Sequence, residues 1–190
     1  FIVGSPRSGT TLVESIATSN NEVFAGGELL TAKNLIGSYL QNKEKDTKKI
    51  MSDFNYKYIK RTDFMRGKSK YIVDKLPENF LYLGYILKFL PKVKVIRLFR
   101  DPWDTAISLY KQRYVQNIPF SSSFFNIGVF MANFEAINLY WNKSIENKDE
   151  RILDLFYEEI VQDDSTAQKK IYRFLEIHAS PKLWFKDTDS

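Results

Sequence analysis

Cysteine is absent from this 190-residue sequence, and histidine occurs only once, as His178. Without cysteine, the chain can form no disulfide and offers no thiolate to a metal ion. One histidine is too few for a histidine-rich metal site. His178 stands apart from every motif described below, so we expect a surface or loop residue rather than a member of a Ser-His-Asp triad. We therefore expect no metal site, and the lack of cysteine fits a reducing, cytoplasmic location.

Long apolar runs and a strong charge of one sign are also missing. No stretch approaches the ~20 consecutive apolar residues of a membrane span. No basic lead and apolar run typical of a signal peptide stands at the start of the chain. The net charge of +5 is modest, and it fits a small anionic ligand as well as weak attraction to nucleic acid. We expect no nucleic-acid partner and no integral membrane segment.

The chain is long enough for one domain with a hydrophobic core, and we expect a single domain over residues 1–190. Short apolar runs predict strands at 1–4, 22–25, 70–74, 92–99 and 151–156. Helical patterns alternate with them, at 10–19, from about Glu28, at 79–90, from Asp101, at 124–145 and at 164–176. This alternation predicts an α/β fold, with a P-loop-like central parallel sheet flanked by helices on both faces. Because residue 1 already lies in a strand, we expect the domain to be truncated at this end.

Three further segments have a structural interpretation. Residues 41–49 are charged and predict a solvated loop or a fraying helix end. Residues 116–123 predict a loop that could act as a lid. The apolar stripe between residues 130 and 141 has helical spacing and predicts core packing.

The opening stretch "FIVGSPRSGTT", residues 1–11, predicts a strand, a tight loop and a helix start. Gly4 and Gly9 allow tight or left-handed backbone conformations and close approach to a ligand. A helix that starts at Thr10 points free N–H groups and its positive dipole end at the loop. The loop adds side-chain donors from Arg7, Ser8, Thr10 and Thr11. The pattern favours an anion site, and the alternative is an ordinary strand–helix turn.

This loop differs from that of nucleotide hydrolases, G-x-x-x-x-G-K-[ST], because Thr10 stands in the place of the lysine. Those enzymes also need an aspartate at the end of a strand to hold Mg²⁺. Here the run "VKVIRLFRDP" places Arg100 at the strand end, before Asp101. Metal-assisted nucleotide hydrolysis is therefore disfavoured, although a P-loop kinase or NTPase stays an alternative.

Five blocks in this order, "FIVGSPRSGTT", "GGEL", "DKLPENF", "RLFRDPWDTAISLY" and "FYEEIV", resemble the sulfotransferases that use 3′-phosphoadenosine-5′-phosphosulfate (PAPS). The "PRSGTT" form is most similar to the tyrosylprotein sulfotransferases and their bacterial relatives, some of which carry tetratricopeptide repeats. The resemblance implies that the 5′-phosphosulfate is bound by Arg7, Ser8, Gly9, Thr10 and Thr11. It implies that the 3′-phosphate is bound by Arg100 and Ser108.

The residues themselves lend some support to the second phosphate site. A guanidinium offers fork-like donors that suit a phosphate. Ser108 lies eight residues after Arg100, about two helical turns on, so the arginine must reach over the helix start to share a ligand with it. The alternatives are a salt bridge from Arg100 to Asp101 or Asp104, and a neutral helix serine.

Sulfuryl transfer needs a base for the acceptor hydroxyl and cations on the leaving phosphate. The resemblance implies Glu28, in "AGGELL", as the base; the alternative is a first-turn glutamate that the helix dipole favours. It implies Lys75 beside the transferring group, with Arg7 also on the leaving phosphate. The alternative for Lys75 is a surface pair with Asp74. Tyr157 matches a tyrosine near the nucleotide in relatives, and core packing is equally consistent.

The sequence thus predicts a sulfotransferase that moves a sulfuryl group from PAPS to an acceptor hydroxyl by metal-independent in-line displacement. The product would be adenosine 3′,5′-bisphosphate, and the acceptor a peptide tyrosine, a sugar, a lipid or a small phenol. A non-catalytic nucleotide-binding module is a further alternative. Relatives carry a segment after the last helix that wraps the adenosine, and "KLWFKDTDS" shows no clear counterpart. We therefore expect the domain to be truncated at this end as well.

Overall fold

The computed structural model describes residues 1–41, 46–112, 119–145 and 149–178. Within these ranges the strands are β1 Ile2–Gly4, β2 Val23–Ala25, β3 Tyr71–Val73, β4 Val95–Phe99 and β5 Ile152–Phe156. The α-helices are α1 Thr10–Thr18, α2 Thr31–Gln41, α3 Thr47–Arg66, α4 Leu83–Phe89, α5 Pro102–Gln112, α6 Phe124–Ser144, α7 Tyr157–Gln162 and α8 Asp164–Leu175. Two 3-10 helices, η1 Pro77–Tyr82 and η2 Pro119–Ser122, complete the described elements.

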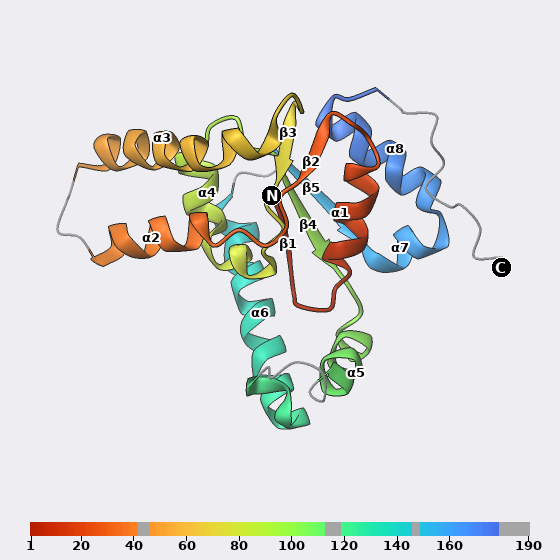
Figure 1. Ribbon diagram of the computed structural model, residues 1–190. Coiled ribbons are helices and arrows are strands. Elements are labelled where there is room, and N and C mark those ends of the chain that lie inside the picture. Colours follow the sequence, from red (N-terminus) through yellow and green to blue (C-terminus); the bar gives the residue numbers. More distant parts are fainter. Residues whose placement is uncertain (42–45, 113–118, 146–148, 179–190) are drawn as a thin grey trace.

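The strands form a central parallel sheet (Figure 1). β4 lies between β1 and β5 and is parallel to both, and β2 pairs in parallel with β3. The two sets meet where the backbone N–H of Ile2 donates to the carbonyl of Asp74, at 3.0 Å, which brings the end of β3 beside β1. This bond places the two-stranded β2-β3 pair beside the three-stranded sheet, whose order is β1-β4-β5. The predicted α/β class and parallel sheet are confirmed.

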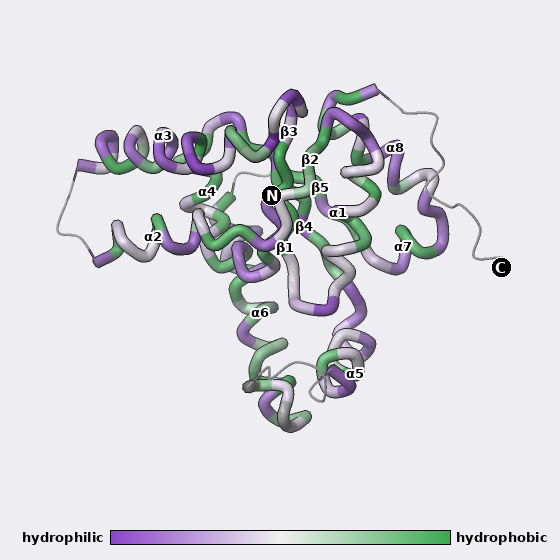
Figure 2. The backbone as a smooth tube through the Cα atoms, in the orientation of Figure 1, coloured by the Kyte–Doolittle hydropathy of each residue, from purple (hydrophilic) through white to green (hydrophobic). Residues whose placement is uncertain are grey.

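Helices cover both faces of the sheet because successive strand residues point to opposite sides. In β1, Ile2 packs into a cluster with α1, α7 and α8, whereas Val3 packs into a second cluster with α2, α3, α4 and α6. Figure 2 shows the strands as hydrophobic at the centre of the molecule, and α3 as largely hydrophilic. Each face of the sheet thus packs against its own hydrophobic core.

Several predicted elements need correction. Residues 47–49, expected in a charged loop, form the first turn of α3, which Asp46 caps by accepting from the backbone N–H groups of Lys48 and Lys49. α3 and α7 were not predicted. The expected helix at 79–90 is divided into η1 and α4. The helix expected from Glu28 begins at Thr31 instead.

The predicted stripe on α6 does pack against the core. Phe134 is buried, and Trp141 donates from Nε1 to the carbonyl of Phe80 at 2.8 Å. Phe130 stacks on Phe120 with ring centroids 4.2 Å apart. His178 is exposed, as expected. Of the segment proposed as a lid, 116–118 lie outside the described residues, and 119–122 form η2.

Candidate active site

Every strand of the sheet is followed directly, or within a few residues, by a side chain that the sequence predicted for the site. Arg7 follows β1, Glu28 follows β2, Lys75 follows β3, Arg100 follows β4 and Tyr157 follows β5. The carboxyl ends of parallel strands meet at one edge of the sheet, where open α/β sheets bind their ligands. The fold therefore gathers the predicted residues at a single edge.

The loop after β1 is a compact turn that glycine makes possible. A Cβ on Gly4 would lie 2.7 Å from the carbonyl oxygen of Leu98, and Gly9 has a φ of +97°. Ser8 donates from its backbone N–H and from Oγ to the carbonyl of Ser5, at 3.1 and 2.7 Å. Within the described residues no side chain caps α1, so its first N–H groups face the loop. This arrangement is a ready anion site.

Arg100 and Tyr157 lie side by side because Phe99 and Phe156 are paired in register at the ends of β4 and β5. The Arg100 guanidinium carbon stands 4.3 Å from the centre of the Tyr157 ring, and Nη1 donates to the Arg7 carbonyl at 2.9 Å. The Nε of Arg100 is buried and has no hydrogen-bond partner among the described residues. This arginine therefore has an unused donor in the site.

Ser108 joins the same group from α5. Arg7 donates from Nε to the Ser108 Oγ at 3.1 Å, although the Arg7 side chain is exposed. Asp101 caps α5 by accepting from the backbone N–H groups of Trp103 and Asp104. No ion pair joins Arg100 to Asp101 or Asp104 in the described chain, so the proposed surface salt bridge is not formed.

Tyr157 also packs against the opening loop. A Cβ on Gly9 would lie only 2.5 Å from Cδ2 of the Tyr157 ring, so this ring occupies the space that any other side chain would need. Thr10 is buried at the start of α1, and Thr11 beside it is exposed. The residues predicted for the two phosphates thus form one contiguous group.

Glu28 and Lys75 form an ion pair, with Lys75 Nζ 2.8 Å from Glu28 Oε1. The Lys75 side chain is 10% exposed, and that of Glu28 is 56% exposed. The alternative pairing of Lys75 with Asp74 is therefore wrong. The alternative of a first-turn helical glutamate is also wrong, because Glu28 precedes α2 by three residues.

The turn that carries Glu28 is held by backbone bonds to β3 and its extension. Gly26 donates to the Val73 carbonyl at 2.9 Å, and Lys75 donates from its backbone to the Gly27 carbonyl at 2.8 Å. A Cβ on Gly26 would lie 2.4 Å from the Val73 oxygen, and Gly27 has a φ of +67°. Two glycines are thus required for Glu28 to reach Lys75.

Asp74 is a buried residue of this region that the sequence indicated only as an alternative surface partner of Lys75. Its carboxylate accepts from the hydroxyl of Tyr58 at 3.0 Å and from Nδ2 of Asn79 at 3.1 Å. Burial raises the pKa of Asp74 to about 6, against the opposing effects of the positively charged Phe1 amino group and of the Tyr58 hydrogen bond. A charged residue directly after an apolar strand was the only signal available in the sequence.

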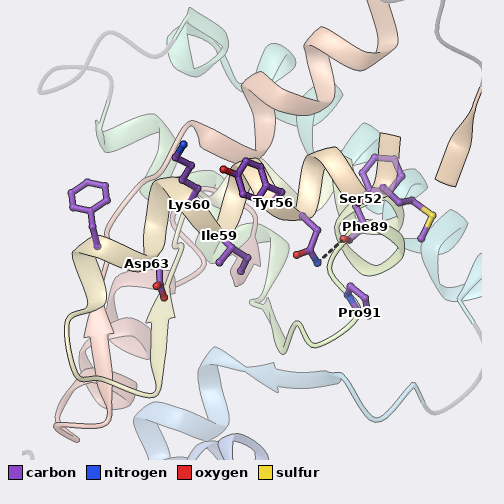
Figure 3. A pocket seen from close by; sticks show the side chains of 10 residues that line it. Ser52, Tyr56, Ile59, Lys60, Asp63, Phe89 and Pro91 are labelled. Atoms are coloured by element: carbon purple, nitrogen blue, oxygen red, sulfur yellow. Dashed lines mark hydrogen bonds between the residues drawn. The ribbon is translucent and has the colours of Figure 1, made fainter. Parts of the chain in front are cut away.

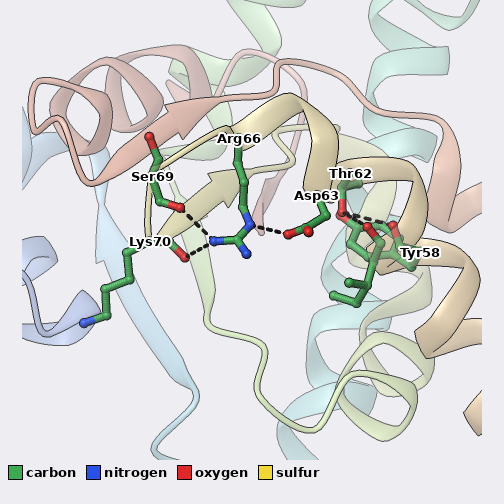
Figure 4. A network of polar contacts seen from close by, with 7 residues as sticks. Tyr58, Thr62, Asp63, Arg66, Ser69 and Lys70 are labelled. Atoms are coloured by element: carbon green, nitrogen blue, oxygen red, sulfur yellow. Dashed lines mark hydrogen bonds and ion pairs between the residues drawn. The ribbon is translucent and has the colours of Figure 1, made fainter.

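Two large cavities lie away from these residues. One, of about 720 Å³, runs along α3 next to Phe89 and Pro91 (Figure 3). The other, of about 700 Å³, opens at the amino ends of the strands and is lined in part by Arg66 and Lys70. Arg66 is held there by Asp63 and by the carbonyls of Ser69 and Lys70 (Figure 4). Neither cavity includes a predicted site residue, because both lie at other parts of the sheet.

The described residues contain no group of three or more acidic or imidazole side chains placed to hold a metal ion. No helix among them is both long enough and apolar enough to cross a membrane.

The family model described as "Sulfotransferase family" matches residues 1–181. The chain belongs to this family. Among curated sulfotransferase relatives, the protein-tyrosine sulfotransferase of Drosophila melanogaster is 22% identical over 93% of this chain and 38% of its own length. An uncharacterised protein of Aquifex aeolicus is 29% identical over 93% of this chain. The sulfotransferase chain spans only a quarter of the length of that protein.

Solved sulfotransferase structures share the fold. The sulfotransferase domain of the curacin biosynthetic pathway superposes with a TM-score of 0.70 at 16% identity, over 95% of this chain and 74% of that one. A sulfotransferase of Alicyclobacillus acidocaldarius superposes with a TM-score of 0.64 at 15% identity, over 94% of this chain and 80% of that one. The mouse sulfotransferase SULT7A1, whose crystal structure contains adenosine 3′,5′-bisphosphate (PAP), superposes with a TM-score of 0.55 at 18% identity. The match covers 95% of this chain and 59% of that one. At these identities the likeness concerns the fold.

Proposed function

We propose that this chain transfers a sulfuryl group from PAPS to an acceptor hydroxyl without a metal ion. The observation that carries the proposal is the meeting of Lys75 and Glu28 at the same sheet edge as the anion-binding loop. Ile2 bonds to Asp74, so Lys75 follows directly beside β1, the strand that leads into the loop. This arrangement supports a site in which a cation, a carboxylate and an anion-binding loop act on one substrate.

The residues present fit a donor with two phosphate positions. The loop from Arg7 to Thr11 offers backbone N–H groups, hydroxyls and a guanidinium to the 5′-phosphosulfate. Arg100 and Ser108 would hold the 3′-phosphate, and the Nε of Arg100, which has no partner among the described residues, is a candidate donor for it. Tyr157 keeps the Arg100 guanidinium in place through its ring face.

In the proposed reaction, PAPS supplies the sulfuryl group. A bond forms between the acceptor oxygen and sulfur, the bond from sulfur to the bridging phosphate oxygen breaks, and the acceptor proton passes to the Glu28 carboxylate. Lys75 and Arg7 balance the negative charge that grows on the departing phosphate. Lys75 has three N–H donors, so it can contact Glu28 and the phosphate together.

The acceptor class stays open among a peptide tyrosine, a sugar, a lipid and a small phenol. The family relative in Drosophila is named as a protein-tyrosine sulfotransferase, which supports a tyrosine peptide as the first acceptor to test.

The experiment measures transfer of labelled sulfate from PAPS to a panel of a tyrosine peptide, a phenol, a sugar and a lipid alcohol. We expect transfer to at least one member without added metal, and loss of about 100-fold or more in Glu28→Gln, the order seen when an acid–base group is removed. Glu135→Gln, an exposed change on α6, is the matched control.

A melting experiment separates the alternatives. We expect adenosine 3′,5′-bisphosphate to raise the melting temperature more than ATP with Mg²⁺ does. Bisphosphate binding with no transfer to any acceptor, and Glu28→Gln equal to native protein, would leave a non-catalytic binding module. Mg²⁺-dependent ATP hydrolysis would favour a kinase or NTPase and overturn the proposal.

A further inference from the structure

Glu14 connects the opening loop's helix to the turn that carries Glu28. It lies in the second turn of α1, four residues after Thr10. Its Oε1 accepts the backbone N–H of Gly27 at 3.1 Å. Gly27 is the residue directly before Glu28, so this carboxylate holds the Gly26–Gly27 peptide, one peptide unit before the proposed base.

The held turn is one that needs support. Gly27 has a positive φ, and a Cβ placed there would meet no atom within 4 Å, so side-chain packing does not restrain this residue. Its carbonyl accepts from the backbone of Lys75, and its N–H is taken by Glu14. The N–H and the carbonyl of Gly27 are thus fixed to two different elements, α1 and the extension of β3.

The choice of residue at position 14 is informative. The Glu14 side chain is only partly buried, and among the described residues it takes part in no ion pair. Partial burial of a carboxylate has a desolvation cost that an apolar side chain of the same size would avoid. The hydrogen bond that Glu14 accepts from the Gly27 N–H offsets this cost. Glutamine could also accept this bond through its side-chain oxygen, but leucine could not.

We propose that Glu14 is a positioning residue that sets the direction of Glu28 toward the acceptor and couples it to the donor loop. The inference rests on the proposed sulfuryl transfer. Because α1 starts at the donor loop, a shift of that helix on donor binding would move the turn through this bond. Glu14 itself touches neither donor nor acceptor, so its loss should affect the reaction step more than donor binding.

The test compares Glu14→Leu, Glu14→Gln and the exposed control Glu135→Leu, using labelled PAPS and the acceptor that native protein uses best. We expect Glu14→Leu to lower kcat by about tenfold or more with KM for PAPS within about threefold of native, because a small misplacement of a catalytic group costs this much. Glu14→Gln should restore kcat to within about threefold of native. Glu135→Leu should match native protein.

Hydrogen exchange adds a readout that needs no acceptor: the Gly27 amide should exchange faster in Glu14→Leu and at the native rate in Glu14→Gln. If Glu14→Leu fails to fold, Glu14→Asp, whose shorter side chain cannot reach Gly27, takes its place. If native protein transfers no sulfate to any acceptor, the proposed function is overturned, and the role of Glu14 with it. Native turnover with an unchanged kcat in the Leu or Asp variant, or an equal loss in Glu14→Gln, overturns the role of Glu14 alone.

Discussion

Lys75 Nζ lies 2.8 Å from Glu28 Oε1, and the two residues follow neighbouring strands, β3 and β2. The lysine is nearly buried, whereas the glutamate is more than half exposed. The pair therefore presents a carboxylate to the surface and keeps its cation inside, next to the strand that enters the anion loop. An acceptor approaching from solvent would meet the carboxylate first.

Lys75→Met should lower kcat for sulfuryl transfer by about 100-fold or more, because the charge that grows on the departing phosphate loses one of its two proposed cations. Steady-state kinetics with labelled PAPS measure this. Lys33→Met is the matched control, since Lys33 forms an exposed ion pair with Glu78 at 2.7 Å. Equal activities in the two variants would remove Lys75 from the proposed mechanism.

Arg100→Ala should abolish the rise in melting temperature that we expect from adenosine 3′,5′-bisphosphate, because the guanidinium proposed to bind the 3′-phosphate is removed. Arg100→Lys should recover only part of the shift, since an ammonium lacks both the fork and the planar stack on Tyr157. Arg173→Ala, an exposed change on α8, should keep the native shift. A full shift in Arg100→Ala would contradict the assignment.

Gly9→Ala should destabilise the fold by about 1 kcal/mol or more from its positive φ, with a further cost from the clash with Tyr157. In contrast, Gly37→Ala should stabilise it by about 0.5–1 kcal/mol, because Gly37 lies inside α2 with open space around it. Urea unfolding of both variants measures these changes. A neutral Gly9→Ala would mean that the loop is not held against Tyr157.

Asp74→Asn should become more stable relative to native protein as the pH rises from about 4 to 8. Burial raises the folded pKa to about 6, so the folded state binds the proton more tightly than the unfolded chain does. The contribution of Asp74 to native stability then falls as the pH rises through this window, by about 3 kcal/mol for a shift of about two units. Burial lowers the pKa of the neighbouring Phe1 amino group to about 6, and this contribution to stability changes with pH in the opposite direction. Asparagine does not titrate and escapes this loss.

The pH experiment has a control of opposite character in Asp163. Hydrogen bonds from the Thr166 side chain and backbone lower the pKa of Asp163 to about 2. Both folded and unfolded states are then ionised above about pH 5, so Asp163→Asn should keep a constant difference from native protein between about pH 5 and 8. If Asp74→Asn and Asp163→Asn showed the same change in stability with pH, the titration of Asp74 would not be its cause.

The elements that could be predicted are those with a strong local pattern. Apolar runs predicted all of the described strands, and the glycines and helix start of residues 1–11 predicted the anion loop. α3 was missed because it reaches the core with few residues, Phe54, Tyr58 and Thr62, on a largely polar helix. α7 is a short helix directly after β5, and its six residues are too few to show the 3.6-residue spacing of apolar side chains that predicts a helix.

The sequence by itself determined which residues follow each apolar run, and its resemblance to the PAPS-dependent sulfotransferases implied the candidates Arg7, Glu28, Lys75, Arg100 and Tyr157. It also determined the glycines without which the two turns cannot form, since positive φ and close backbone approach are local properties. The chemistry available at the site was therefore readable from residue types and their order.

Only the tertiary structure decided which of these residues meet. Lys75 pairs with Glu28 and not with Asp74, Arg100 stacks on Tyr157, and Glu14 holds Gly27. These partners are far apart in the chain, and the register of parallel strands and the position of α1 bring them together. Such contacts depend on the packing of whole elements, which no local pattern records.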